Sequence, residues 1–242
     1  MAEYVLFKFR KIDKFVLKSI VQSELYFARP ERLNDPFDCK VDIISALENA
    51  ISKSESPSRQ RLENLRGMDG FFKKVQTDLA NMGVCSFSLE LLNPLMWSHY
   101  ADGHRGLCLT YSFPESFFYD NAEQILGVDQ VDYGINPLSD WFLQEAHQLN
   151  SFERFGISLI TKALTVKAQP WEYEKEVRII RRTEGLQAIN MRYLKQVCFG
   201  LATPDPDVTL VRKLIDQGDY KVTICNMERN EESDFGLKVL EV

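Results

Sequence analysis

Residues 93–112 read NPLMWSHYADGHRGLCLTYS and predict a short helix that turns directly into a strand. The Asn-Pro pair at its start has the chemistry of an N-cap followed by a first helical position, and Gly103 suits the left-handed residue that closes a helix. The apolar run that follows has the composition of a strand. We therefore expect His104 and Arg105 in the tight connection between the two elements, where a rigid scaffold often holds functional polar groups.

Alternating and apolar segments on both sides of this unit predict further strands. They span residues 4–10, 25–28, 84–88, 171–180, 197–199, 222–225 and 235–240. Helical periodicity and capping residues predict helices between them. These helices follow Asp13 or span 41–53, 62–82 and 138–166, and a last one lies between Asp205 as its N-cap and Gly218.

The order of these elements predicts the fold class. The 138–166 segment is expected to form one long helix or a broken one, which Pro170 ends, and the polar stretch 54–59 is expected to form an exposed loop. Gly67 and Gly70 offer an alternative in which the 62–82 segment forms two helices. The chain has neither an internal repeat nor a regular strand–helix–strand alternation. We therefore expect a single α+β domain over 1–242, with a long helical insertion near 138–166.

The composition is that of an ordinary soluble globular protein, with 45% hydrophobic and 26% charged residues in 242. Such a length can bury a core without disulfides or metals. The longest apolar runs fall short of the roughly 18 residues that a membrane helix needs. The first residues lead into a strand-like segment without the pattern of a signal peptide. We expect a cytoplasmic protein with no membrane partner.

Charge and cysteine spacing exclude two further classes. The net charge is −6 and the pI is near 5.3, so the protein as a whole repels phosphate backbones. Nonspecific nucleic-acid binding is therefore not expected. The five cysteines contain no CxxC pair, and His99 and His104 are five residues apart, a spacing that does not align two imidazoles on one helical face. We expect no metal site. The common dinucleotide, P-loop, zinc-protease and hydrolase motifs are also missing from the sequence.

The segment 171–180 carries the sharpest chemical pattern. If it is one strand, residues 172, 174, 176 and 178 share a face, because side chains alternate along an extended chain. The Cβ atoms of Glu174 and Glu176 would then lie roughly 6.5 to 7 Å apart, close enough for each charge to raise the pKa of the other. A paired acid and base is one interpretation. The alternative is a solvated edge strand with an ion-pair ladder to nearby arginines.

Five stretches carry a family resemblance: LYFARPERLNDPFD at 25–38, VCSFS at 84–88, LMWSHYADGHRGLCLTYSF at 95–113, WEYEKEVRII at 171–180 and KQVCFG at 195–200. With them the chain resembles a bacterial family known as domain of unknown function 2971, from about residue 6 to 200. It also looks like a distant relative of the ADP-ribosyltransferases. That resemblance implies an α+β fold with a split, β-sandwich-like core and helical insertions, which binds NAD in a cleft.

The ADP-ribosyltransferase resemblance also implies roles for particular residues. One class of that superfamily has an arginine on its first strand, a Ser-x-Ser on a middle strand and a Glu-x-Glu on a later one. Arg10, Ser86, Ser88, Glu174 and Glu176 stand here in that order. The resemblance implies that Arg10 holds the NAD pyrophosphate, that Ser86 or Ser88 orients the substrate, and that the glutamates are catalytic, with Glu176 on the 2′-hydroxyl of the nicotinamide ribose. NAD would be a substrate, with no metal needed.

Three functions remain open at this point. The first is an enzyme that cleaves the nicotinamide glycosidic bond of NAD and transfers ADP-ribose. The second is a nucleotide-binding sensor without chemistry, whose polar pocket is formed by Asn34, Asp35, Tyr100, His104 and Arg105. The alternative for Tyr100 is a structural role, since an aromatic residue at helical spacing from Trp97 is often part of the hydrophobic core. The third is a module that binds only a protein partner from the same operon, in phage defence or a toxin–antitoxin system.

Overall fold

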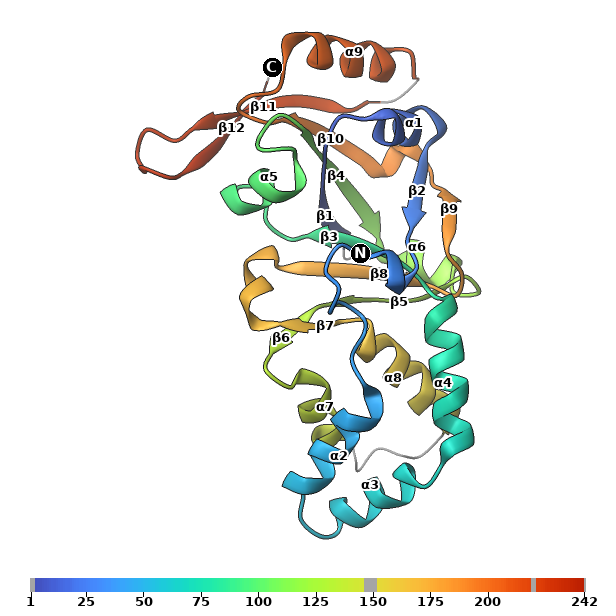
Figure 1. The fold of residues 1–242 in the computed structure, drawn as a ribbon. Coiled ribbons are helices and arrows are strands. Elements are labelled where there is room, and N and C mark those ends of the chain that lie inside the picture. The colour runs from blue at the N-terminus through green and yellow to red at the C-terminus, as the bar shows by residue number, and fades with distance from the viewer. Residues whose placement is uncertain (1–2, 146–151, 219–220, 242) are drawn as a thin grey trace.

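The computed structural model describes residues 3–145, 152–218 and 221–241 (Figure 1). Its centre is an eight-stranded sheet in the order β12-β11-β10-β4-β1-β3-β8-β5. The strands of this sheet are β1 (Glu3–Arg10), β3 (Gly83–Ser88), β4 (Leu107–Pro114), β5 (Ile125–Gln130), β8 (Glu176–Arg181), β10 (Leu194–Phe199), β11 (Thr223–Arg229) and β12 (Leu237–Glu241). Two small sheets pair β2 (Glu24–Phe27) with β9 (Gly185–Ala188) and β6 (Asp132–Gly134) with β7 (Val166–Ala168).

The large sheet consists of two parts that meet at one pair of residues. β1 and β4 pair from Glu3 to Arg10, whereas β1 and β3 are in register only at Phe7 and Ser88. In Figure 1 β1 and β4 run steeply while β8 and β5 run across the view, so the sheet curls at this junction. β10 and β11 are parallel, and the other neighbours in the sheet are antiparallel.

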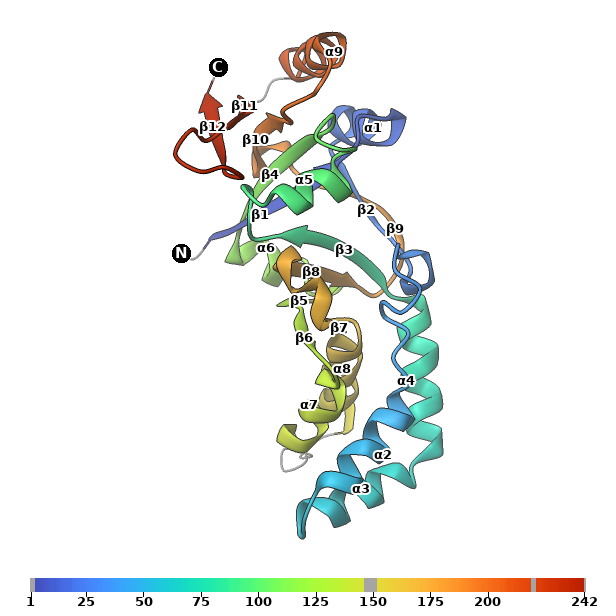
Figure 2. The same cartoon turned by 60° about the vertical axis from the view of Figure 1, so that its left-hand side comes forward.

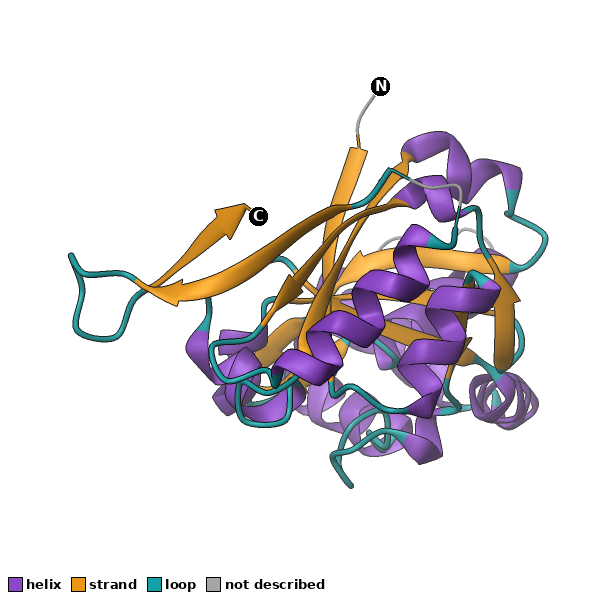
Figure 3. Cartoon of the chain, turned by 90° about the horizontal axis from the view of Figure 1, so that it is seen from above, coloured by secondary structure: helices purple, strands orange, loops and turns teal. Residues whose placement is uncertain are grey.

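Helices cover both parts of the sheet. The helices are α1 (Lys14–Gln22), α2 (Ile43–Lys53), α3 (Ser58–Arg66), α4 (Asp69–Asn81), α5 (Pro94–Tyr100), α6 (Glu115–Asp120), α7 (Pro137–Glu145), α8 (Phe152–Ala163) and α9 (Asp205–Asp216). Three short 3-10 helices are η1 (Pro30–Arg32), η2 (Gln169–Glu174) and η3 (Met191–Tyr193). Figure 2 shows α2, α3, α4, α7 and α8 gathered at the end of the molecule beyond β3, β8 and β5. Seen from above in Figure 3, the β11–β12 hairpin projects away from this body.

Local sequence signals explain several helix ends. The carboxylate of Asp13 accepts hydrogen bonds from the backbone of Phe15 and Val16, and the side chain of Asn93 accepts one from Leu95. Trp97 on α5 is fully buried and packs edge-on against Phe9, with ring centroids 5.1 Å apart. α5 is thereby fixed against β1.

The structure is α+β, as the sequence predicts, and several elements follow their predicted bounds. The break at Gly67 and Gly70 is confirmed by separate helices α3 and α4, of which α3 already begins at Ser58 inside the predicted polar loop. The 138–166 segment contains two helices, α7 and α8, as the broken form predicts, with residues 146–151 outside the described chain. The expectation that Pro170 ends the helix is wrong, since α8 ends at Ala163 and β7 precedes Pro170. The N-cap of α9 is Pro204 rather than Asp205.

The predicted strand over 171–180 is the most consequential correction. Its first part is the 3-10 helix η2, and the strand begins only at Glu176. Lys175 between them takes a left-handed conformation with φ of 44°, which interrupts the alternation of side chains. Pro170 near the start of η2 favours this 3-10 helix, since its fixed φ suits the first turn of a helix.

No described helix is both long enough and apolar enough to cross a bilayer.

Candidate functional site

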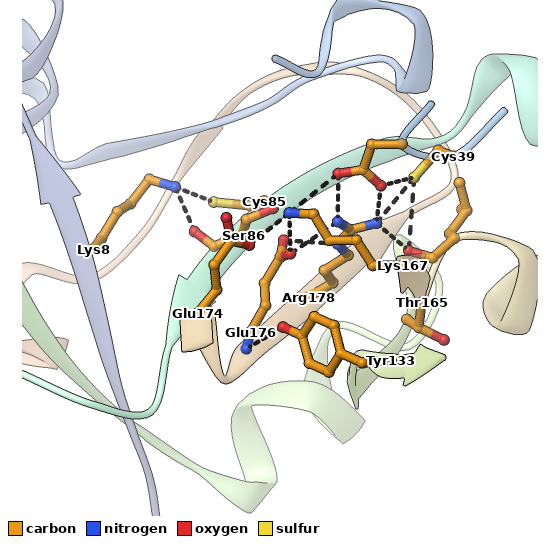
Figure 4. A network of polar contacts seen from close by, with 12 residues as sticks. Lys8, Cys39, Cys85, Ser86, Tyr133, Thr165, Lys167, Glu174, Glu176 and Arg178 are labelled. Carbon is orange, nitrogen blue, oxygen red and sulfur yellow. Dashed lines mark hydrogen bonds and ion pairs between the residues drawn. The ribbon is translucent and has the colours of Figure 1, made fainter. Parts of the chain in front are cut away.

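A network of buried charged side chains lies where the loop after η1 meets β8 (Figure 4). It joins three carboxylates to two cations. The carboxylates belong to Asp38, Glu174 and Glu176, and the cations to Lys167 and Arg178. These residues come from the 33–42 loop, β7, η2 and β8, so the network holds together segments that are far apart in the sequence.

Arg178 is the centre of the network and is 0% exposed. Its Nε and Nη2 donate to the two carboxylate oxygens of Glu176, at 2.7 and 2.9 Å. Its Nη1 and Nη2 donate to the two oxygens of Asp38, at 2.9 and 2.7 Å. The guanidinium therefore makes a bidentate contact with each of two carboxylates, the strongest geometry that such a pair can adopt. Nη1 also donates to the carbonyl of Leu164 at 2.7 Å.

Lys167 is the second cation of the network. Its Nζ donates to Oε2 of Glu174 at 2.5 Å and to Oε2 of Glu176 at 3.1 Å, and it lies 3.6 Å from Oδ2 of Asp38. One ammonium thus faces all three acids. Its Nζ also lies 5.1 Å above the ring of Trp171, at a distance typical of a cation–π contact.

Two local turns bring the acidic groups into place. Asp35 accepts a hydrogen bond from the backbone N–H of Phe37 at 2.9 Å, which fixes the turn that leads to Asp38. The left-handed Lys175 reverses the chain between Glu174 and Glu176, so both carboxylates reach Lys167 although η2 and β8 differ in conformation. The acidic pair is therefore real, but a turn and not a strand face creates it.

Hydroxyl groups complete the hydrogen bonds around the glutamates. Tyr100 on α5 donates to Oε1 of Glu174 at 2.5 Å, and Ser88 donates to the backbone carbonyl of Glu174 at 2.7 Å. The backbone N–H of Glu176 donates to the hydroxyl of Tyr133 at 2.9 Å. These contacts connect the network to both α5 and β6.

The two glutamates have pKa values that are displaced in opposite directions. Burial would raise the pKa of Glu176, but the charge and hydrogen bonds of Arg178, together with Lys167 and Ser86, hold it at about 2. Burial raises the pKa of Glu174, and the contacts with Lys167 and Tyr100 offset only part of that increase. Although burial opposes its charge, the carboxylates raise the pKa of Lys167. The pKa of Glu176 is thus lowered by its cationic partners, whereas burial leaves the pKa of Glu174 above its ordinary value.

A cavity of about 440 Å³, here called the loop cavity, opens beside this network. Its walls come from the 35–42 loop, α2, residues 134–139 and β7. Asp38 and Lys167 belong to both the network and the cavity wall. The side chains of Phe37 and Ile135 also line it and are 82% and 92% exposed. The cavity wall therefore combines charged groups with two exposed apolar side chains.

The structure brings together half of the residues that the sequence singled out. Those within the network or in contact with it are Ser86, Ser88, Tyr100, Glu174 and Glu176. Asp35 lines the loop cavity. The other four candidates lie apart from both: Arg10, Asn34, His104 and Arg105.

Arg10 does not face the acidic pair, contrary to the expected shared cleft. Ser88 is in register with both Phe7 and Glu176, so these three side chains share one face of the sheet. Arg10 is three residues from Phe7 and therefore points to the opposite face. Lys8 is two residues from Arg10 and shares its face. Its Nζ lies 3.3 Å from Sγ of Cys85, which is three residues from Ser88 and therefore also on the face opposite to Ser88. An arginine on that face cannot hold the pyrophosphate of a substrate bound at Glu176.

The turn at His104 and Arg105 packs against another part of the chain. The carbonyl of His104 accepts a hydrogen bond from Ala202 at 2.9 Å, and Arg105 pairs with Asp102 at 3.2 Å. Asn34 is exposed and outside the cavity wall. No described hydrogen bond or ion pair joins Asn34 to His104 or Arg105, and none of the three lines the loop cavity.

Sequence reasoning missed Asp38 and Lys167 as site residues and treated Arg178 only as a charge partner. Asp38 stands in the NDPFD motif, so that motif was a usable signal. Lys167 lies between the predicted 138–166 helix and the predicted 171–180 strand, and it carried no visible signal. Within the described residues, no group of three or more histidine, cysteine or acidic side chains has a geometry that could hold a metal ion.

Comparison with known proteins supports one part of the resemblance. Residues 96–179 match the model of a family described as Protein of unknown function (DUF2971). This range runs from α5 into β8 and contains Tyr100, Lys167, Glu174, Glu176 and Arg178, while Asp38 precedes it. Neither the curated proteins nor the solved structures gave a match. The link to ADP-ribosyltransferases stays a prediction.

Proposed function

We propose that the protein binds a nucleotide in the loop cavity, with NAD as the first ligand to test. The observation that carries the proposal is that Asp38 and Lys167 belong both to the cavity wall and to a buried charge network. Clefts that join a pocket to titratable groups with displaced pKa values are frequent functional sites. A volume of about 440 Å³ lies in the usual range for a small-molecule pocket.

The chemistry of the walls suits an amphipathic ligand of this kind. Phe37 and Ile135 offer apolar surface that the fold itself leaves in water, and a heteroaromatic ring can cover such surface. Asn49 and Asn136 line the same cavity and can bond ribose hydroxyls or ring nitrogens. A nucleotide combines the ring with these polar groups in one molecule.

A second candidate function is cleavage of the bond between nicotinamide and ribose. It is favoured by Glu174 and Glu176, whose carboxylates both contact Nζ of Lys167 while their pKa values are displaced in opposite directions. Such separation is typical of an acid and a base that work together. In this reaction the C1′–N bond breaks, its electron pair leaves with nicotinamide, and water or another acceptor adds to C1′. A carboxylate stabilises the positive charge that develops on the ribose.

Titration calorimetry with NAD tests the binding proposal. We expect saturable binding to the full chain, and at least a tenfold loss of affinity in Asn49→Trp, because Asn49 lines the cavity and an indole there would fill it. Ser52→Trp is the matched control, since Ser52 is exposed on the same helix but outside the cavity wall. Equal affinities of the two variants, or no binding of NAD by the natural chain, would refute the proposal.

Nicotinamide release measured by chromatography in the same samples separates the two candidates. Release that depends on the protein would support cleavage, and binding without release would support a sensor. If NAD neither binds nor reacts, the partner-binding module is the function that remains.

A further inference from the structure

Ser139 is a buried polar side chain that nothing in the fold uses. It is 3% exposed and lines the loop cavity. Its hydroxyl makes no hydrogen bond with any described residue. The Oγ atom is not among the fully enclosed polar atoms that lack a partner, so it is accessible from the cavity that Ser139 lines. A residue that is otherwise buried thus presents an unpaired hydroxyl to the cavity, where a ligand can hydrogen-bond it.

Ser139 lies in the first turn of α7, and this turn borders the cavity from Asn136 to Ser139. The first N–H groups of any helix have no acceptor within the helix. Pro137 has no N–H, and no described group accepts a hydrogen bond from the backbone of Leu138 or Ser139. The helix end therefore offers free donors next to the unpaired hydroxyl, in the arrangement that binds anions.

The charges around the cavity allow an anion there. Lys40 lines the cavity, is exposed, and forms no ion pair within the described chain. The acidic groups on the wall are already engaged. Asp35 and Asp42 accept hydrogen bonds from backbone N–H groups, and Asp38 is held by the guanidinium of Arg178. Lys40 is thus left free to balance a negative charge on a ligand.

We propose that the first turn of α7 is a phosphate subsite, in which Ser139 and the adjacent N–H groups hydrogen-bond a phosphate of the ligand and Lys40 balances its charge. The proposal deepens the proposed function and rests on it only for the identity of the whole ligand. It specifies a phosphorylated nucleotide rather than a free nucleoside. Nothing in the subsite requires Arg10, which the sequence had suggested for this task.

Ser139→Ala tests the subsite against a merely structural role. A hydrogen bond to a charged group contributes about 1.5 to 3 kcal/mol, so this variant is expected to bind NAD about tenfold or more weakly than the natural chain. Its affinity for nicotinamide riboside, which has no phosphate, is expected to stay unchanged. The urea midpoint is expected to stay level or rise, because the substitution removes an unpaired hydroxyl and no intramolecular bond.

Ser112→Ala is the matched control. Ser112 is also buried, but it lies on β4 and its hydroxyl donates to Oε2 of Glu3 at 2.5 Å. This variant is expected to lose stability and to keep its affinity for NAD, the reverse of the pattern at Ser139.

Inorganic pyrophosphate serves as a probe that is independent of the proposed function. If NAD binds equally to the natural chain and to Ser139→Ala, the subsite is refuted and the nucleotide proposal survives. If NAD fails to bind but pyrophosphate binds in a way that Ser139→Ala weakens, the subsite stands and the choice of NAD is wrong. If neither probe binds, both proposals are refuted.

Discussion

Arg178→Met is the perturbation that tests the buried network most directly. The variant keeps much of the side-chain volume but leaves Asp38 and Glu176 without the guanidinium that contacts both. Removing one partner of a buried ion pair costs about 3 to 5 kcal/mol, because the remaining charge stays buried and unpaired. The expected loss in unfolding free energy at pH 7 is therefore about 3 to 5 kcal/mol.

The displaced pKa of Glu176 gives a second measure of this magnitude. A change from the ordinary pKa of 4.5 to about 2 corresponds to about 3.5 kcal/mol, at about 1.4 kcal/mol for each pKa unit. Arg178, Lys167 and Ser86 share this amount, and the stranded Asp38 adds to the cost of the variant. The stabilisation is fully present above pH 4.5 and is lost as the pH falls towards 2, since the folded-state pKa is lowered. The difference between the two proteins should therefore shrink at pH 3.

Urea unfolding followed by tryptophan fluorescence measures both effects, since the chain has three tryptophans. Arg181→Met provides the control on the same strand. Arg181 is also buried, but it donates only to Gln124 at 2.8 Å and pairs with no carboxylate in the described chain. Its guanidinium also lies 5.2 Å from the ring centroid of Phe27. Its loss should cost about 1 to 2 kcal/mol, the usual contribution of one hydrogen bond and one cation–π contact. Equal costs for the two arginine variants at pH 7, or a difference that is independent of pH, would refute the reasoning.

Two further predictions concern the acids and the cavity mouth. Glu176→Gln is expected to lower the unfolding free energy at pH 7 more than Glu174→Gln does, because the fold lowers the pKa of the first residue and raises that of the second, so it stabilises the charge of Glu176 more; urea unfolding gives the order, and the reverse order would contradict it. Phe37→Ala is expected to weaken NAD binding about two- to tenfold without loss of stability, since its 82% exposed ring contributes little to the core. Phe235→Ala, on the distant β11–β12 hairpin and similarly exposed, should leave calorimetric binding unchanged.

The sequence predicted features that depend on neighbouring residues. The cap at Asn93, the cap at Asp13 and the break between α3 and α4 follow from a few adjacent side chains, and the structure confirms them. The strand over 171–180 failed because alternation of charged residues does not reveal a left-handed residue in its middle. Lys175 has a positive φ, which non-glycine residues adopt infrequently, so no local propensity announced it.

The candidate site depended on long-range pairing that a single sequence does not display. Asp38 and Arg178 are 140 positions apart, and neither segment carries a pattern that predicts a contact with the other. Arg10 shows the same limit in another form. Alternation along β1 places the side chains of Arg10 and Phe7 on opposite faces of the sheet. Only the register between Phe7 and Ser88 shows which of these faces also carries Glu176. The position of Arg10 on the face opposite to Glu176 therefore follows from the pairing of Phe7 with Ser88, which the sequence alone does not show.

The satisfied and unsatisfied polar groups of this region suggest a division of tasks. Arg178 and Glu176 have all their charged atoms bonded within the chain, as is expected of groups that fix a fold. Ser139 and Lys40, on the wall of the adjoining cavity, have no such partners among the described residues. Groups of the first kind should govern stability, and groups of the second kind should govern binding. Lys167 is of the first kind, because it is paired with three carboxylates, but it also lines the cavity. A ligand that approaches Lys167 would therefore act on the network through its ammonium, which gives binding a direct physical route to the stability of the fold.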